Sequence, residues 1–158
     1  MNTRPSTTQQ RIDQMVAKLK AHDCRITPQR LAILRILAAG EDHPSVEMVH
    51  ERVKHEFPTT SIATVYKTVH LLKQINEVVE IAFPDWSNRY DGGKPFPHPH
   101  VICIRCRKIT DPKLGFLKNM TAQVAAETGF DIVEYRLDFF GICADCKEKE
   151  GPTKEELT

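Results

Sequence analysis

The chain has 158 residues, of which 41% are apolar and 27% are charged, so its composition is that of an ordinary soluble protein with one domain or two small ones. No run approaches the roughly 18 apolar residues of a membrane span. The first residues also lack the apolar core of a signal peptide. A cytoplasmic location is therefore expected. The net charge of +1 neither favours nor excludes nucleic acid as a partner.

Positive charge is concentrated at the N-terminus. Residues 1–35 carry seven basic side chains against only Asp13 and Asp23. Such a patch is a candidate phosphate-binding surface, and the alternative is a solvated helix face. The basic residues are Arg4, Arg11, Lys18, Lys20, Arg25, Arg30 and Arg35.

Apolar residues recur at helical spacing in the first half of the chain and predict four helices. Thr27, Ser45 and Ser61 are the expected N-caps of the second, third and fourth helices. Short strands are expected over residues 78–82 and 86–90. The predicted core positions are Ile12, Met15, Val16, Leu19, Leu31, Leu34, Leu37, Ala38, Val46, Val49, Val53, Phe57, Ile62, Val65, Val69 and Leu72.

Helices followed by a two-stranded ribbon are typical of a winged helix-turn-helix, in which the last helix enters the major groove of DNA. The polar face of the fourth helix offers hydroxyls, a phenol and an ammonium for bases and phosphates. We expect Arg25 to reach a phosphate or the minor groove. The alternative is a small helical bundle without a ligand. The expected contacts on the fourth helix are Ser61, Thr64, Tyr66 and Lys67.

The second half begins at residues 91–97, where two Gly and two Pro indicate a hinge. Strands are predicted over 101–104 and 108–110. A helix is predicted from Asp111 to Thr128, and a half-buried strand over 133–139, with Val133, Tyr135, Leu137 and Phe139 on its buried face. A region this small is marginally stable alone, so a zinc ion or a dimer interface would help it fold.

Four of the five cysteines form two Cys-x-x-Cys pairs, which indicate one tetrahedral Zn²⁺ site. The alternative is four unrelated core or redox cysteines. Cys24 is expected to pack as a small apolar group. His98 and His100 are two residues apart and point to the same side of a strand, so both are candidate ligands of a second metal. The expected zinc ligands are Cys103, Cys106, Cys143 and Cys146.

Taken jointly, the motifs of the chain resemble those of the ferric uptake regulator family of metal-responsive bacterial repressors. The resemblance covers residues 10–148 in the family's order. The motifs that carry it are Arg25-Ile-Thr-Pro-Gln-Arg30, His43-Pro44, Ser61-Ile-Ala-Thr-Val-Tyr66, Asn88-Arg-Tyr-Asp91, His98-Pro-His100, Cys103-x-x-Cys106 and Cys143-x-x-Cys146.

The resemblance implies an α+β fold, with an N-terminal winged helix-turn-helix domain and a small α/β dimerisation domain that holds the structural zinc. The expected boundaries are residues 1–84 for the DNA-binding domain, 85–97 for the hinge, 98–148 for the dimerisation and metal-binding domain, and 149–158 for a disordered tail. Residues 1–8 are also expected to be disordered.

The resemblance also implies a regulatory metal site with one Fe²⁺ or Mn²⁺ per subunit, beside one structural Zn²⁺. The donor set also suits Zn²⁺ or Co²⁺. From the residues alone, Asp111 before a proline is equally a helix N-cap, Asp91 a turn residue and His43 a loop residue. The implied ligands are His43, Asp91, His98, His100 and Asp111.

Two departures from the family pattern narrow the subtype. Some members have a further site that uses an acidic residue and a histidine at positions held here by Pro99 and Tyr135, so one regulatory metal is expected. Asp91 stands where iron-responsive members usually have Glu, and this resembles the peroxide-sensing branch. In that branch the oxidised histidines match His43 and His98.

The resulting hypothesis is a metal-dependent DNA-binding repressor that is not an enzyme. It acts as a homodimer on an inverted-repeat operator and senses peroxide. The metal would tie the two halves of the chain together and select one arrangement of the recognition helices. The alternatives are an iron-, manganese- or zinc-responsive uptake repressor of the same family, a zinc-storage or adaptor module, and a small hydrolase or oxygenase that uses His98, His100 and Asp111. The enzyme hypothesis lacks a phosphate loop and a clear nucleophile.

Overall fold

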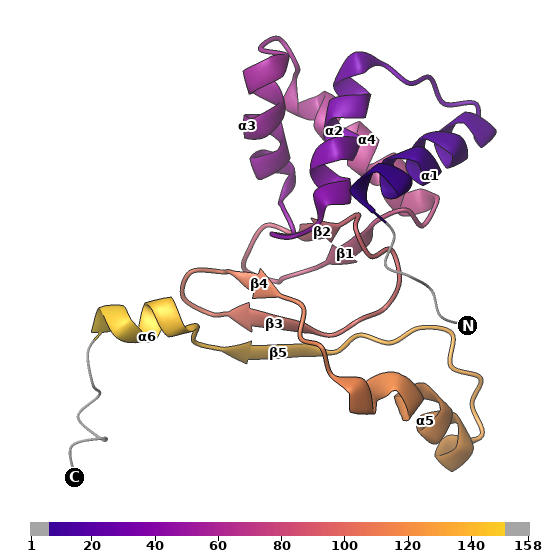
Figure 1. Cartoon of the computed structure of the whole chain (residues 1–158), viewed down its shortest axis with the longest axis vertical. Helices are drawn as coiled ribbons and strands as arrows, with labels where there is room; N and C mark the ends of the chain where they lie inside the picture. The colour runs from indigo at the N-terminus through magenta and orange to yellow at the C-terminus, as the bar shows by residue number, and fades with distance from the viewer. Residues whose placement is uncertain (1–6, 151–158) are drawn as a thin grey trace. The chain divides into compact units, whose positions relative to one another are not determined.

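The computed structural model describes residues 7–150 and divides into two units, residues 1–96 and 97–158 (Figure 1). Within the described residues, no helix combines the length and apolar character needed to span a membrane. For residues 1–6 and 151–158 the predicted disorder lies outside the described part of the chain. Lys149 and Glu150 were also predicted to be disordered, but they belong to a helix (Ala144–Glu150). Thr7 and Thr8 were also predicted to be disordered, but Thr7 caps the first helix and Thr8 begins it.

The first unit consists of four helices and a two-stranded sheet (Figure 1). The second, third and fourth helices begin where the sequence predicts, because a side-chain oxygen at each start accepts a hydrogen bond from a backbone N–H that has no partner inside the helix. Thr27, Ser45 and Ser61 all act in this way. The helices are α1 (Thr8–Ala21), α2 (Pro28–Ala39), α3 (Val46–Glu56) and α4 (Ile62–Gln74).

The core of this unit forms around α2, which packs against α1, α3 and α4. Fourteen apolar side chains from these helices are buried together, and most of the predicted core positions are among them. Ile62 is an exception, since 39% of its surface is exposed at the first position of α4. Val16, Leu31 and Phe57 are only partly buried.

The two-stranded sheet of the first unit consists of β1 (Val79–Ile81) and β2 (Arg89–Asp91), paired antiparallel with Glu80 opposite Tyr90. Helices followed by a ribbon confirm the expected winged helix-turn-helix order. The N–H of Tyr90 donates to the Pro44 carbonyl at 3.0 Å, which ties β2 to the loop between α2 and α3.

The second unit is built on a three-stranded sheet in the order β4-β3-β5 (Figure 1). Its central strand β3 (His100–Cys103) is antiparallel to β4 (Ile109–Thr110) and parallel to β5 (Asp138–Gly141). The parallel pair needs a long crossover, and the segment with α5 (Met120–Thr128) supplies it. Helix α6 (Ala144–Glu150) follows β5.

The predicted helix over Asp111–Thr128 is wrong at its start. Residues 111–114 are not helical, and a 3₁₀ helix (Gly115–Asn119) precedes α5. The Asp111 side chain lies beside two imidazole rings and caps no helix. The predicted stop is confirmed, since Gly129 has φ +74° at the end of α5.

The predicted strand over 133–139 is wrong for most of its length, because β5 contains only Asp138–Gly141. A strand exists only where a neighbour supplies its hydrogen bonds, and β3 pairs with β5 from Asp138 onward. Val133 was expected to be buried but is 95% exposed.

The second unit leaves much apolar surface in solvent. Ile102 and Ile109 are its buried aliphatic residues, whereas Phe116 and Phe130 are more than two-thirds exposed. Phe139 and Phe140 on β5 are also exposed. A surface of this kind commonly marks a protein–protein interface.

Candidate metal centres

Four cysteine thiols meet at one end of the second unit. Cys103 ends β3, and Arg107, with φ 62°, turns the chain after Cys106. Cys143 precedes α6 and Cys146 lies in its first turn. The four sulfurs lie within 4.8 Å of one another, so the cysteines form one cluster and are not scattered core residues.

The spacing of these sulfurs fits a tetrahedral zinc ion. Two Sγ–Sγ distances are 3.9 Å, for Cys103 and Cys146, and 3.6 Å, for Cys106 and Cys143. A tetrahedron with Zn–S bonds of about 2.3 Å has edges of about 3.8 Å. The donor set and its geometry therefore suit the structural Zn²⁺ expected from the sequence.

The local electrostatics of the cluster also favour a cation. Backbone N–H groups of Cys106 and Cys143 donate to the Cys103 sulfur and lower its pKa to about 6. A hydrogen bond with the Cys143 side chain, together with burial, raises the pKa of Cys146 to about 12. Additional thiolates therefore form readily only when a cation neutralises them.

A second cluster in the same unit brings together His98, His100 and Asp111. The two histidine Nε2 atoms are 3.0 Å apart. The Asp111 carboxylate lies 3.4 Å from Nε2 of His98 and 3.8 Å from Nε2 of His100. Ligand atoms around a metal with bonds of about 2.1 Å are spaced by about 3.0–3.4 Å. The predicted same-side arrangement of the two imidazoles is present, and their spacing suits one ion.

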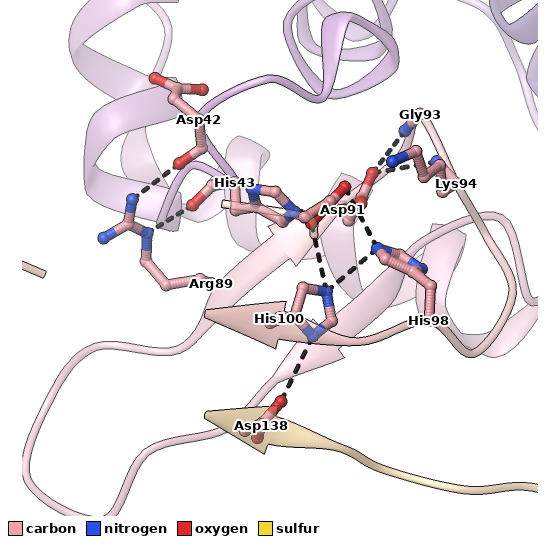
Figure 2. Close-up of polar contacts among 10 residues, drawn as sticks. Asp42, His43, Arg89, Asp91, Gly93, Lys94, His98, His100 and Asp138 are labelled. Carbon is pink, nitrogen blue, oxygen red and sulfur yellow. Dashed lines mark hydrogen bonds and ion pairs between the residues drawn. The ribbon is translucent and has the colours of Figure 1, made fainter. Parts of the chain in front are cut away.

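The first unit contains a separate pair of candidate ligands, His43 and Asp91. The His43 Nε2 atom lies 3.2 Å from Oδ2 of Asp91. The other carboxylate oxygen of Asp91 accepts hydrogen bonds from the N–H groups of Gly93 and Lys94 at 2.8 and 3.0 Å (Figure 2). Asp91 is therefore a turn residue as well as a candidate ligand, because each oxygen has a different partner.

His43 has φ 48°, an uncommon value for a residue with a side chain. The Arg89 guanidinium donates to the carbonyls of His43 and Asp42, the latter at 2.8 Å (Figure 2). These bonds hold the loop in its left-handed conformation. Sequence reasoning assigned Arg89 no role beyond its place in a family motif.

Asp138 is a further residue that sequence reasoning missed. Its carboxylate lies 3.3 Å from Nδ1 of His100 (Figure 2). The alternating pattern of residues 133–139 had placed Asp138 on the solvent face with Glu134 and Arg136. The side chain is only 7% exposed.

The residues expected to contact DNA lie at α4 and in the segment before α2. Tyr66 and Lys67 are exposed on α4, and Arg25 is exposed before α2. The Ser61 hydroxyl caps α4 and lies 3.0 Å from the Thr64 hydroxyl. The Tyr66 hydroxyl donates to Glu47 of α3 at 3.0 Å, which raises the pKa of the phenol.

The predicted basic surface contains fewer free positive charges than the number of basic residues in residues 1–35 suggested. Arg11 is buried and forms an ion pair with Glu77 at 3.0 Å, so it does not belong to a solvent-facing surface. Lys18 also pairs with Glu77, at 2.6 Å. Arg4 lies outside the described residues. Cys24 is partly buried against the core, as expected for a small apolar group.

Comparisons with known proteins identify relatives of this chain. The profile of the ferric uptake regulator family matches residues 21–140. The peroxide-responsive repressor PerR of Staphylococcus epidermidis is 34% identical over 141 residues, which cover 87% of this chain and 91% of the relative.

Two solved structures share the fold. The Campylobacter jejuni peroxide stress regulator is 30% identical, with a TM-score of 0.67 over 83% of this chain and 98% of its own. The Helicobacter pylori ferric uptake regulator has a TM-score of 0.76 over 91% of this chain and 96% of its own, at 21% identity. With its winged-helix unit, its cysteine cluster and a profile match over most of its length, this chain belongs to the ferric uptake regulator family.

Proposed function

We propose that this chain is a metal-dependent transcriptional repressor that senses peroxide through a regulatory Fe²⁺ or Mn²⁺ site. The observation that carries the proposal is the cluster of His98, His100 and Asp111, with two imidazole nitrogens 3.0 Å apart beside a carboxylate. Mixed imidazole and carboxylate donors suit Fe²⁺ and Mn²⁺, although they also accept Zn²⁺. The 34% identity to a peroxide-responsive repressor supports the same subtype.

The proposed regulatory site combines ligands from both units. His43 and Asp91 come from the winged-helix unit, and His98, His100 and Asp111 come from the other. One ion bound to both sets would restrict the two units to one arrangement, and loss of a ligand would release that restriction. Metal binding would in this way be coupled to DNA binding. The thiols of Cys103, Cys106, Cys143 and Cys146 would hold the separate structural Zn²⁺, whose binding energy is also folding energy.

The proposed partner is double-stranded DNA with an inverted-repeat operator, bound by a homodimer in the cytoplasm. Support for the DNA surface comes from α4, which follows a helix–turn segment and exposes Tyr66 and Lys67. Support for the homodimer comes from the exposed apolar side chains of the second unit, such as Phe116 and Phe130. Ser61, Thr64 and Arg25 would add phosphate or base contacts.

The proposed signal is peroxide. Fe²⁺ held by these residues would supply the redox chemistry that activates peroxide. In the net reaction an imidazole ring of His43 or His98 would take up one oxygen atom of H₂O₂, and the other oxygen atom would leave as water. A ring that carries an added oxygen binds metal less well, so the two units separate and the DNA is released. Mn²⁺ does not drive this chemistry readily, and the Mn²⁺ form should bind DNA yet resist peroxide.

The test combines DNA binding with mass spectrometry. We expect a gel shift of an inverted-repeat operator with Fe²⁺ or Mn²⁺, and none without metal or with His43→Ala. His55→Ala, which changes an exposed histidine of α3, is the matched control and should bind like the wild type. After stoichiometric peroxide, the Fe²⁺ form should gain the mass of one oxygen atom on peptides with His43 or His98 and lose DNA.

Three outcomes would change the assignment. An unmodified protein that stays on DNA would leave an iron-, manganese- or zinc-responsive repressor of the same family. Release of DNA with oxidation of cysteines only would reject histidine-based sensing. Wild-type DNA affinity in both Tyr66→Ala and Lys67→Ala would mean that the recognition surface is not on α4.

A further inference from the structure

We propose that Asp138 is a positioning residue for the regulatory metal: it accepts the Nδ1 hydrogen of His100 and so directs the lone pair of Nε2 at the ion. This inference rests on the proposed function, because it requires that His100 is a metal ligand. Asp138 itself would not touch the metal. The proposal adds a sixth residue to the site, from a strand that carries none of the other five.

The pairing of two parallel strands brings Asp138 to His100. In the register of β3 and β5, these two residues are directly opposite. The N–H of His100 also donates to the Leu137 carbonyl at 3.0 Å, which fixes the backbone of the pair. The Asp138 carboxylate then lies 3.3 Å from Nδ1 of the ring (Figure 2). Both side chains are nearly buried, at 5% and 7% exposure, so water does not compete strongly for this contact.

The chemistry of the carboxylate determines which nitrogen of His100 bears hydrogen. A carboxylate only accepts hydrogen bonds, so Nδ1 must donate. In a neutral imidazole the other nitrogen, Nε2, then carries a lone pair. Nε2 is the atom that lies 3.0 Å from Nε2 of His98 and 3.8 Å from the Asp111 carboxylate. The donor hydrogen therefore faces β5, and the ligand atom faces the other ligands.

Arg136 makes the arrangement specific for a carboxylate at position 138. Its Nε donates to Oδ2 of Asp138 at 2.5 Å, while Oδ1 faces His100. Both neighbours of the side chain are thus donors. An asparagine has only one acceptor oxygen, so it must turn its NH₂ group toward either Arg136 or His100. An NH₂ group turned toward Arg136 would place two hydrogen-bond donors against each other. An NH₂ group turned toward His100 would favour the tautomer in which Nε2 bears hydrogen and cannot bind metal.

The first experiment measures Mn²⁺ affinity of the zinc-loaded protein from the paramagnetic resonance signal of free Mn²⁺. Loss of a hydrogen-bond partner behind a metal-bound histidine typically weakens metal binding by about 10- to 100-fold. We expect a loss of this size in Asp138→Asn, with the zinc content and the dimer mass unchanged. Asp138→Glu should recover part of the affinity. Glu134→Gln, which removes an exposed carboxylate from the same segment, is the matched control and should bind like the wild type.

The deciding result of the second experiment comes from the wild type and does not depend on a folded variant. Nitrogen-15 chemical shifts of the wild-type imidazoles, recorded with zinc but without the regulatory metal, report which ring nitrogen of His100 bears hydrogen. We expect hydrogen on Nδ1 in the wild type and a shift toward Nε2 in Asp138→Asn. A wild-type ring with hydrogen on Nε2 would overturn the proposal, as would wild-type Mn²⁺ affinity in Asp138→Asn.

A His98→Ala variant separates this inference from the proposed function. Loss of Mn²⁺ binding in His98→Ala together with wild-type affinity in Asp138→Asn would reject only the role of Asp138. Wild-type affinity in His98→Ala would reject the regulatory site itself, and the positioning role with it.

Discussion

Replacement of Arg11 by Met should destabilise the first unit more than any change of an exposed charge. The Arg11 and Glu77 side chains are only 5% and 4% exposed, and their charges are 3.0 Å apart. Arg11 also donates from Nε to the Gly92 carbonyl at 2.9 Å, directly after the candidate ligand Asp91. Removal of Arg11 therefore leaves a buried carboxylate and a buried carbonyl without this donor.

The size of the effect follows from what remains around Glu77. Removal of one partner of a buried ion pair typically costs about 3–5 kcal/mol. The Lys18 ammonium stays 2.6 Å from Glu77, so we expect the lower end, about 3 kcal/mol. Lys18 itself is 52% exposed, and Lys18→Met should cost less than about 1 kcal/mol because solvent screens its charge.

Urea unfolding followed by the fluorescence of Trp86, the single tryptophan, measures this difference in the first unit. The midpoint should fall in Arg11→Met without a change in the slope. The double variant Arg11→Met, Glu77→Leu should recover part of the loss, since it no longer buries an unpaired charge. A loss below about 1 kcal/mol in Arg11→Met, or a larger loss in the double variant, would refute the reasoning.

Three further predictions concern single sites. In Gly92→Ala the new Cβ would lie 2.7 Å from the Met15 Cε and 2.8 Å from a backbone oxygen of α2. Thermal unfolding should therefore show that the free energy of unfolding falls by about 1–3 kcal/mol. Gly115→Ala, whose new Cβ would have nothing within 4 Å, is the control and should leave the stability unchanged. In zinc-free reduced protein, the ultraviolet thiolate absorbance should rise near pH 6 and should not do so in Cys103→Ser, because backbone N–H groups lower the pKa of Cys103 from 9.0 to about 6. This lowered pKa stabilises the zinc-free fold fully above pH 9, and the contribution disappears as the pH falls through about 6. Thr27→Ala should cost about 1 kcal/mol in the same unfolding assay, because α2 loses its N-cap.

Local signals in the sequence were sufficient for the helix starts of α2, α3 and α4 in the first unit, whereas the strand expected over residues 86–90 is present only as β2 (Arg89–Asp91). An N-cap depends on a few consecutive residues, so Thr27, Ser45 and Ser61 could be recognised without knowledge of the fold. The cysteine pairs were equally informative, because a metal-binding knuckle is also a local structure.

Features that depend on tertiary contacts could not be predicted in the same way. Asp111 before a proline has the pattern of a helix start, yet its carboxylate lies beside His98 and His100. Arg11 and Asp138 look like surface charges in the sequence, because burial next to a partner distant in the chain leaves no local pattern. The spacing of residues 133–139 indicated a strand, but only the pairing with β3 decides where hydrogen bonds form.

The parallel pairing of β3 and β5 restricts the insertions and deletions that this protein can accept during evolution. Strand β3 begins with His100 and ends with Cys103, and β5 begins with Asp138 and leads directly to Cys143. A single residue inserted or deleted within either segment, between His100 and Cys103 or between Asp138 and Cys143, would turn the side chains beyond it to the opposite face of the sheet. Either the imidazole or the thiol would then point away from its partners. Substitutions can accumulate along these two segments, but changes in their length would be eliminated, so the spacing should outlast much of the sequence itself.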